Sequence, residues 1–295
     1  MTKPTFNNLL LATNDPPPTT HYSTVSRIDS TFAALKSSGR MAFMPFITAA
    51  DPDLDTTLEL IRTLAKQGVD LIEVGFPYSD PIADGPVIQA SYTRALNKKA
   101  TVAQIFEAFG KLDAANLPPL VAMLSYAIIF RHGPKEFLQQ AKKAGFSGFI
   151  VPDLPGDEAA EMFSLVREAG LDLVQLVAPT TPPDRVRQIV KNSSGFVYCI
   201  AVAGTTGVRE QVADQLLKQL DWLKTETKLP LAVGFGIGKP EHVDPLRGKA
   251  DGVIVGSAVV KHMQDLADGT TTKEAALASI GELAKAMSDR AHAGK

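Results

Sequence analysis

Eight short apolar runs recur along the chain, and they constrain its fold more than any other feature. Most are continuously apolar, which is typical of strands that are covered on both faces. Segments with helical spacing separate them, and glycines such as Gly68 end several of these helices. This alternation predicts a parallel sheet. The runs lie near residues 41–48, 70–75, 119–125, 148–152, 172–177, 196–201, 230–234 and 251–255.

The number of these units predicts an α/β fold of the (β/α)8 TIM-barrel type, for which about 250 residues are typical. An open doubly wound sheet is the alternative, but it usually has a glycine-rich dinucleotide-binding turn after its first strand. Here the first expected strand ends in T-A-A-D-P, without that turn. An extra helix is expected before this strand, from Arg27 to Gly39, because Ile28, Phe32 and Leu35 have helical spacing.

The first 26 residues differ in composition from the rest of the chain. They contain Pro16, Pro17 and Pro18, and their only charged residues are Lys3 and Asp15. We expect a flexible N-terminal extension over residues 1–26 and a catalytic barrel domain over residues 27–295. The extension is rich in Ser and Thr like a plastid transit peptide, but it lacks the arginines typical of such peptides, so targeting is the less favoured alternative.

Composition excludes several classes of partner. A formal net charge of -2 argues against nucleic acid as a partner. No apolar run approaches the roughly 20 residues of a membrane-spanning helix, so no membrane partner is expected. Cys199 is the single cysteine, which excludes a disulfide within the chain and indicates a reducing compartment. A cytoplasmic location is therefore expected.

A carboxylate interrupts the second apolar run. Glu73 lies between Ile72 and Val74, and burying an ionised carboxylate costs several kcal/mol unless it is paired. Asp80 and Asp84 follow in the next loop, at the carboxyl end of a strand, where barrel enzymes place their chemistry. Glu73 and Asp84 are therefore predicted to be a proton-transfer pair. Three alternatives stay open: a structural ion pair of Glu73, turn roles for the two aspartates, or a divalent cation bound by all three.

Glycines near the last two expected strands predict a phosphate site. Gly234, Gly236 and Gly238 follow one strand, and Gly256–Ser257 follows the other. Backbone N–H groups at a helix N-terminus bind anions, and barrels often place phosphate at these two loops. Gly204 and Gly207 could close over the same group. The alternative is that the glycines only permit tight turns.

Other chemistries lack the necessary residues. Of the five histidines only His132 is near a strand end, and no lysine falls inside an expected strand. Neither a zinc cluster, nor a Ser-His-Asp triad, nor Schiff-base chemistry is supported. Four apolar residues near strand ends either line a cleft or belong to the barrel core: Phe46, Leu124, Ile150 and Phe235. The residues predict a barrel enzyme for a phosphorylated substrate without defining its reaction.

Several motifs show that the chain resembles the tryptophan synthase α subunit family from about Arg27 to near the C-terminus. The most specific is L-I-E-V-G-F-P-Y-S-D-P-I-A-D-G-P, which contains Glu73 and Asp84. The others are G-R-M-A-F-M-P-F-I-T-A-A-D-P, V-P-D-L-P, A-P-T-T-P, G-T-T-G-V-R, V-G-F-G-I and V-G-S-A-V-V-K.

The resemblance implies a lyase of tryptophan biosynthesis that cleaves indole-3-glycerol phosphate to indole and glyceraldehyde 3-phosphate. The family's catalytic residues fall on Glu73 and Asp84. Its phosphate site matches Gly207, Gly236, Gly256 and Ser257. Its indole site matches Phe46, Leu124, Ile150 and Phe235, and further cleft and loop positions match Tyr126, Asp153, Tyr198 and Thr206.

The resemblance also implies a β subunit as partner, in an αββα heterotetramer. Pyridoxal phosphate is expected only on that β subunit, and neither a cofactor nor a metal is expected on this chain. Ile128 replaces a common Asn, and Ala201 replaces a common Ser, so coupling to the β subunit could differ. A lyase that acts alone and a non-catalytic activator of the β subunit are the alternatives.

Overall fold

The computed structural model describes residues 25–294 apart from 83, 157, 202–208 and 235, and it describes only the backbone of residues 209–213. Its strands are all parallel and close a barrel in chain order. The TIM-barrel prediction is confirmed. The strands are β1 (Ala42–Thr48), β2 (Ile72–Gly75), β3 (Leu120–Met123), β4 (Phe146–Ile150), β5 (Asp172–Val177), β6 (Val197–Ile200), β7 (Leu231–Gly234) and β8 (Gly252–Val255).

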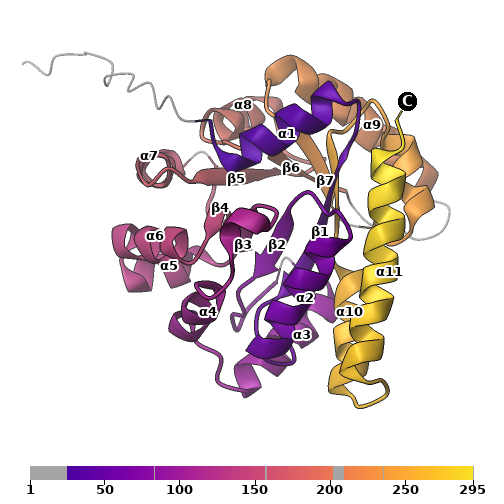
Figure 1. The fold of residues 1–295 in the computed structure, drawn as a ribbon. Coiled ribbons are helices and arrows are strands. Elements are labelled where there is room, and N and C mark those ends of the chain that lie inside the picture. The colour runs from indigo at the N-terminus through magenta and orange to yellow at the C-terminus, as the bar shows by residue number, and fades with distance from the viewer. Residues whose placement is uncertain (1–24, 83, 157, 202–208, 235, 295) are drawn as a thin grey trace, which may run out of the picture.

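Helices surround the barrel (Figure 1). Between β7 and β8 the described connection is a 3-10 helix, η2 (Pro240–Leu246), with Pro245 inside it. A second 3-10 turn, η1 (Ala114–Asn116), precedes β3. The α-helices are α1 (Arg27–Ser37), α2 (Leu54–Lys66), α3 (Pro86–Asn97), α4 (Val102–Phe109), α5 (Tyr126–His132), α6 (Pro134–Lys143), α7 (Ala160–Glu168), α8 (Pro183–Lys191), α9 (Arg209–Glu226), α10 (Ser257–Ala267) and α11 (Lys273–His292).

The core has two layers because successive strand residues point to opposite faces of the sheet. In β8, Ile254 belongs to the cluster inside the barrel, whereas Val253 and Val255 belong to the cluster beneath the helices. This arrangement explains why the strands are apolar at nearly every position. It also means that a polar side chain in a strand is buried whichever way it points.

The expected N-terminal helix is present as α1. Ser26 begins it with a capping box, in which the Ser26 Oγ accepts a hydrogen bond from the Asp29 N–H at 3.0 Å. Its apolar face joins the cluster inside the barrel, where Phe32 and Phe196 lie with ring centroids 5.7 Å apart. Ile28 lies against Gly195, just before β6. Helix α1 therefore covers the amino ends of the strands and leaves the opposite end for a site.

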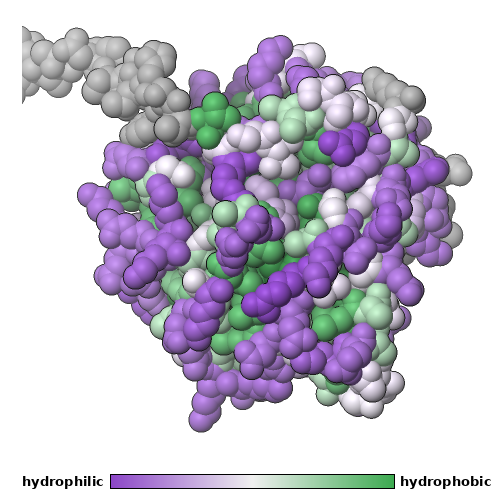
Figure 2. All heavy atoms as spheres, in the orientation of Figure 1, coloured by the Kyte–Doolittle hydropathy of each residue, from purple (hydrophilic) through white to green (hydrophobic). Residues whose placement is uncertain are grey.

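The outer surface is mostly hydrophilic on the face that Figure 2 shows, with hydrophobic residues visible between the charged ones. Within the described part of the chain, no helix combines the length and the apolar character needed to cross a membrane. The extension predicted over residues 1–26 lies outside the described residues as far as residue 24, and its flexibility stays a prediction.

Candidate active site

Glu73 is buried inside the barrel as the second residue of β2. It is 3% exposed and lies in register with Phe46 of β1 and Val121 of β3. Neither Oε1 nor Oε2 has a hydrogen-bond partner among the described residues. Within this part of the chain, the alternative of a structural ion pair for Glu73 is therefore wrong. Burial raises the pKa of Glu73 to about 8, and the negative charge of Asp84 adds to the rise.

Asp84 lies on the loop between β2 and α3 and is also buried. Burial raises the pKa of Asp84 to about 6, and a hydrogen bond from the Tyr78 hydroxyl partly offsets that rise. Its Oδ2 has no hydrogen-bond partner among the described residues. The two carboxyl groups interact, so their protons are lost in coupled steps. The order of their pKa values makes Glu73 the acid and Asp84 the carboxylate near neutral pH.

Both carboxyl groups line one cavity of about 740 Å³ at the carboxyl end of the barrel. Its walls are mainly apolar, which suits a flat apolar ligand with a few polar contacts. The lining residues on the strands and on the loops beside them are Phe46, Glu73, Asp84, Gly85, Ile88, Met123, Ile150, Pro152, Leu176, Tyr198, Ile200, Ala201 and Ile254.

The other end of the cavity is formed by the loops after β7 and β8. Gly236, Gly256 and Ser257 line it, together with Ile237, Gly238 and Ala258. Gly236 has φ +77°, a conformation that favours glycine. Helix α10 begins at Ser257, and the N–H groups of a first helical turn have no partners within their own helix, so this end can accept an anion.

Two basic side chains, Lys239 and His242, line the cavity at this same end. The Gly238 N–H donates to His242 Nδ1 at 3.3 Å, so the second ring nitrogen of His242 is left to donate. Neither residue was predicted from the sequence. The sequence did contain an indication for Lys239, since this residue directly follows the G-F-G-I-G run that predicted the phosphate site.

Tyr198 of β6 closes the cavity wall beside Gly234. A Cβ added at Gly234 would lie 2.1 Å from the Tyr198 hydroxyl, so the tyrosine occupies the space that a side chain would fill. The pKa of Tyr198 lies well above its usual value because of burial and the charges of Glu73 and Asp84. The wall of the site therefore requires a glycine at position 234.

Leu124 lies elsewhere than expected. It is fully buried in the cluster beneath the helices, and its neighbour Met123 lines the cavity instead. Consecutive residues of an extended chain face opposite sides, so only one of the two can face inward. The placement of Leu124 beneath the helices therefore does not support its expected contact with the indole.

Tyr126 and Asp153 lie together at the ends of β3 and β4, but the cavity as described does not include them. Asp153 Oδ1 accepts a hydrogen bond from the Tyr126 N–H at 2.7 Å, and Asp153 Oδ2 accepts one from the Ser125 Oγ at 2.6 Å. The carboxylate thus holds the start of α5. Ile128 is partly buried and packs against the outer cluster.

Three further predicted residues, Thr206, Gly207 and Phe235, lie outside the described residues, as does most of the loop 204–209.

Asp80 is exposed and accepts a hydrogen bond from the Ser79 Oγ. No group of three His, Cys, Asp or Glu side chains that could hold a metal occurs in the described parts of the chain.

The fold and this site define a class of protein: a TIM-barrel enzyme with two buried carboxyl groups in one cavity, which the loops after β7 and β8 line at the other end.

Comparisons with known proteins define the family. The family model described as tryptophan synthase alpha chain matches residues 32–291. A tryptophan synthase alpha chain from Rhodopirellula baltica is 45% identical over 241 residues, which cover 81% of this chain and 87% of that one. Another, from Chloroflexus aggregans, is 42% identical over 269 residues, 91% of this chain and 100% of that one. Among solved structures, this chain matches the crystal structure of tryptophan synthase subunit alpha from Legionella pneumophila with a TM-score of 0.81 and 33% sequence identity. The match covers 90% of this chain and 98% of the Legionella chain. The chain belongs to the tryptophan synthase alpha chain family.

Proposed function

We propose that Glu73 and Asp84 catalyse the reaction of this family, the cleavage of indole-3-glycerol phosphate to indole and glyceraldehyde 3-phosphate. Such an activity makes the protein a carbon–carbon lyase of tryptophan biosynthesis. The observation that carries the residue assignment is the Glu73 carboxyl, which is buried without a cationic partner among the described residues and lines the same cavity as Asp84.

The chemistry needs a group that both gives and takes a proton. Glu73, protonated below a pKa of about 8, gives its proton to C3 of the indole and makes that carbon tetrahedral. Asp84, ionised above a pKa of about 6, accepts a hydrogen bond from the ring N–H, which becomes acidic in this intermediate. Glu73 then takes the proton of the adjacent glycerol hydroxyl. The C–C bond breaks, its electron pair restores the indole ring, and the aldehyde forms.

The substrate is proposed to lie with its phosphate at the β7 and β8 end. The N–H groups near Gly236, Gly256 and Ser257 support this orientation, and Gly207 and Thr206 are proposed to complete it. The indole is proposed to pack against Phe46 and Ile150, which line the cavity, and against Phe235. The loops over residues 77–85 and 204–209 are proposed to close over the substrate and to exclude water.

Members of this family work with a β subunit, and we propose an αββα heterotetramer for this chain. Two exposed hydrophobic side chains support docking at the carboxyl end of the barrel: Ile82, 93% exposed, in the loop after β2, and Phe130, 70% exposed, in α5.

Pyridoxal phosphate is assigned to the β subunit, with no cofactor on this chain. A cytoplasmic location is proposed, in keeping with the single, buried cysteine.

The test compares Glu73→Gln and Asp84→Asn with the wild-type chain in an assay of indole release, with and without a β subunit. Each variant is expected to lose about 10²- to 10⁴-fold in kcat while it still binds a glycerol-phosphate analogue. Near-normal turnover by Glu73→Gln would contradict the assignment. Wild-type cleavage that is complete without a β subunit would favour a lyase that acts alone, and no cleavage in either condition would favour a non-catalytic activator.

A further inference from the structure

Asp84 lies in a turn that one side chain of α3 holds. Within the turn, the Asp84 N–H donates to the Pro81 carbonyl at 3.0 Å. The Gln89 side chain reaches back from the first turn of α3, and its Nε2 donates to the Asp84 carbonyl at 2.8 Å and to the Pro81 carbonyl at 3.2 Å. One amide group therefore binds both ends of the turn that carries the Asp84 carboxyl.

Helix α3 is itself attached to β1 by a buried hydroxyl pair. Thr48 Oγ1 and Ser91 Oγ lie 2.6 Å apart, and the Ser91 Oγ also lies 2.6 Å from the Ile88 carbonyl. A carbonyl can only accept, so Ser91 donates to Ile88 and Thr48 donates to Ser91. Because both hydroxyls are buried, this contact fixes the middle of α3 relative to β1, the strand that pairs with β2.

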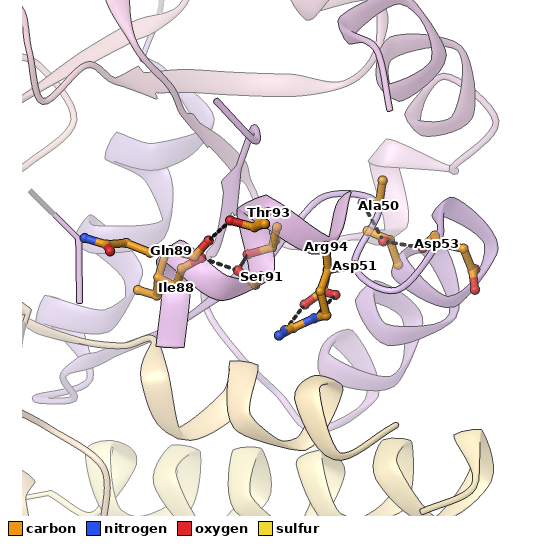
Figure 3. A network of polar contacts seen from close by, with 10 residues as sticks. Ala50, Asp51, Asp53, Ile88, Gln89, Ser91, Thr93 and Arg94 are labelled. Carbon is orange, nitrogen blue, oxygen red and sulfur yellow. Dashed lines mark hydrogen bonds and ion pairs between the residues drawn. The ribbon is translucent and has the colours of Figure 1, made fainter. Parts of the chain in front are cut away.

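A second attachment lies farther along α3. The Arg94 guanidinium forms two hydrogen bonds with the Asp51 carboxylate, at 2.8 Å and 2.7 Å, in the loop after β1. The Asp51 side chain is 1% exposed and the Arg94 side chain 20%, so the carboxylate of this ion pair is shielded from water. Figure 3 shows Gln89 at one end of the network and Ser91 between Gln89 and Arg94. Helix α3 is thus held at two points and presents Gln89 toward the turn.

We infer that Gln89 is a positioning residue for Asp84. It transmits the fixed position of α3 to the turn and so holds the Asp84 carboxyl in place for the ring N–H of the substrate. This inference rests on the role proposed above for Asp84. Misplacing a reacting group by about 1 Å can reduce a rate by roughly 10²-fold, so a change at Gln89 is expected to act on turnover even though Gln89 itself does not line the cavity.

The alternative is that Gln89 only stabilises the start of α3. Gln89 is exposed, so its replacement should not unfold the chain, and the two readings can be separated by kinetics. A stabilising role alone would change the free energy of unfolding and leave kcat unaltered. A positioning role changes kcat through Asp84, so its effect should disappear once Asp84 can no longer act.

The experiment measures indole release, KM and thermal unfolding for the full chain and four variants: Gln89→Met, Asp84→Asn, the double variant that combines both, and Thr93→Ala. Methionine keeps the length of the side chain and removes both donors. Thr93 is the matched control, because its hydroxyl donates to the Gln89 carbonyl within α3 and has no hydrogen bond to the described residues of the turn.

We expect Gln89→Met to lower kcat roughly tenfold, with KM changed less than about twofold. On the Asp84→Asn background the same change should lower kcat less than about twofold, and Thr93→Ala should resemble the wild type. A normal kcat for Gln89→Met beside an impaired Asp84→Asn would overturn this inference alone. An equal loss on both backgrounds, or a similar loss in Thr93→Ala, would also overturn it. Wild-type turnover by Asp84→Asn would instead overturn the proposed role of Asp84.

Discussion

Replacing Glu73 by Gln should make the folded chain more stable at alkaline pH, because the cost of a buried carboxylate grows with pH. Burial raises the pKa of Glu73 from 4.5 in an exposed chain to about 8 in the folded one. Below pH 4.5 the carboxyl is protonated in both states, so its ionisation adds no cost to folding. As pH rises toward 8, the unfolded chain releases the proton while the folded chain keeps it, so unfolding is favoured. Above pH 8 both states are ionised and the cost is complete.

The size of the effect follows from the interval between the two pKa values. At about 1.36 kcal/mol for each pH unit, the full cost of Glu73 to folding is roughly 5 kcal/mol, and roughly 4 kcal/mol of it develops between pH ~5 and pH ~9. A buried amide at position 73 also lacks partners, which costs about 1–3 kcal/mol. That cost does not depend on pH, so it cancels when one variant is compared at two pH values.

Urea unfolding followed by far-UV circular dichroism measures the difference directly. The free energy of unfolding of Glu73→Gln minus that of the wild type should be several kcal/mol larger at pH ~9 than at pH ~5. Glu107→Gln, at an exposed position, is the control and should change the free energy of unfolding by less than about 0.5 kcal/mol at either pH. If the difference for Glu73→Gln were the same at both pH values, the buried, protonated state of Glu73 would be refuted.

Two further predictions concern charges around the site. Lys239→Met should raise KM for indole-3-glycerol phosphate about two- to fivefold at low ionic strength, with kcat little changed, because it removes a cation beside the anion-accepting end. Steady-state kinetics at two salt concentrations test this, and a KM that does not change at low salt would contradict it. Arg94→Met should lower the free energy of unfolding at neutral pH by about 3 kcal/mol, because Asp51 would stay buried without its partner. The loss should shrink in acid, where Asp51 is protonated; a loss below about 1 kcal/mol at neutral pH in urea unfolding would show that the pair contributes little.

The barrel itself could be predicted from the sequence, because its signal is local. Each strand is short and apolar on both faces, each helix follows at a regular interval, and these patterns are written in neighbouring residues. The helix before the first strand was equally clear from the spacing of Ile28, Phe32 and Leu35. The position of Glu73 within a strand predicted its burial, since both faces of such a strand are covered.

The details of the site depended on which way each side chain points and on which elements meet in space. Whether Met123 or Leu124 faces the cavity is set by the register of β3 in the closed sheet, and two adjacent apolar residues carry no signal that separates them. The absence of a cation beside Glu73, within the described residues, could not be read from the sequence, because an arginine from any distant segment could have reached it.

What the sequence determined by itself was the alternation of strands and helices, the carboxyl-end loops and the carboxylate inside β2. Periodicity and turn residues act over a few positions, and such short-range signals are legible along a single chain. Only the tertiary structure decided that Lys239 lines the same cavity as the predicted pair Glu73 and Asp84, and that Gln89, Ser91 and Arg94 link the turn at Asp84 to β1. Two of these contacts, Ser91 with Thr48 and Arg94 with Asp51, join residues 43 positions apart, so they depend on how α3 packs against β1 and not on local sequence.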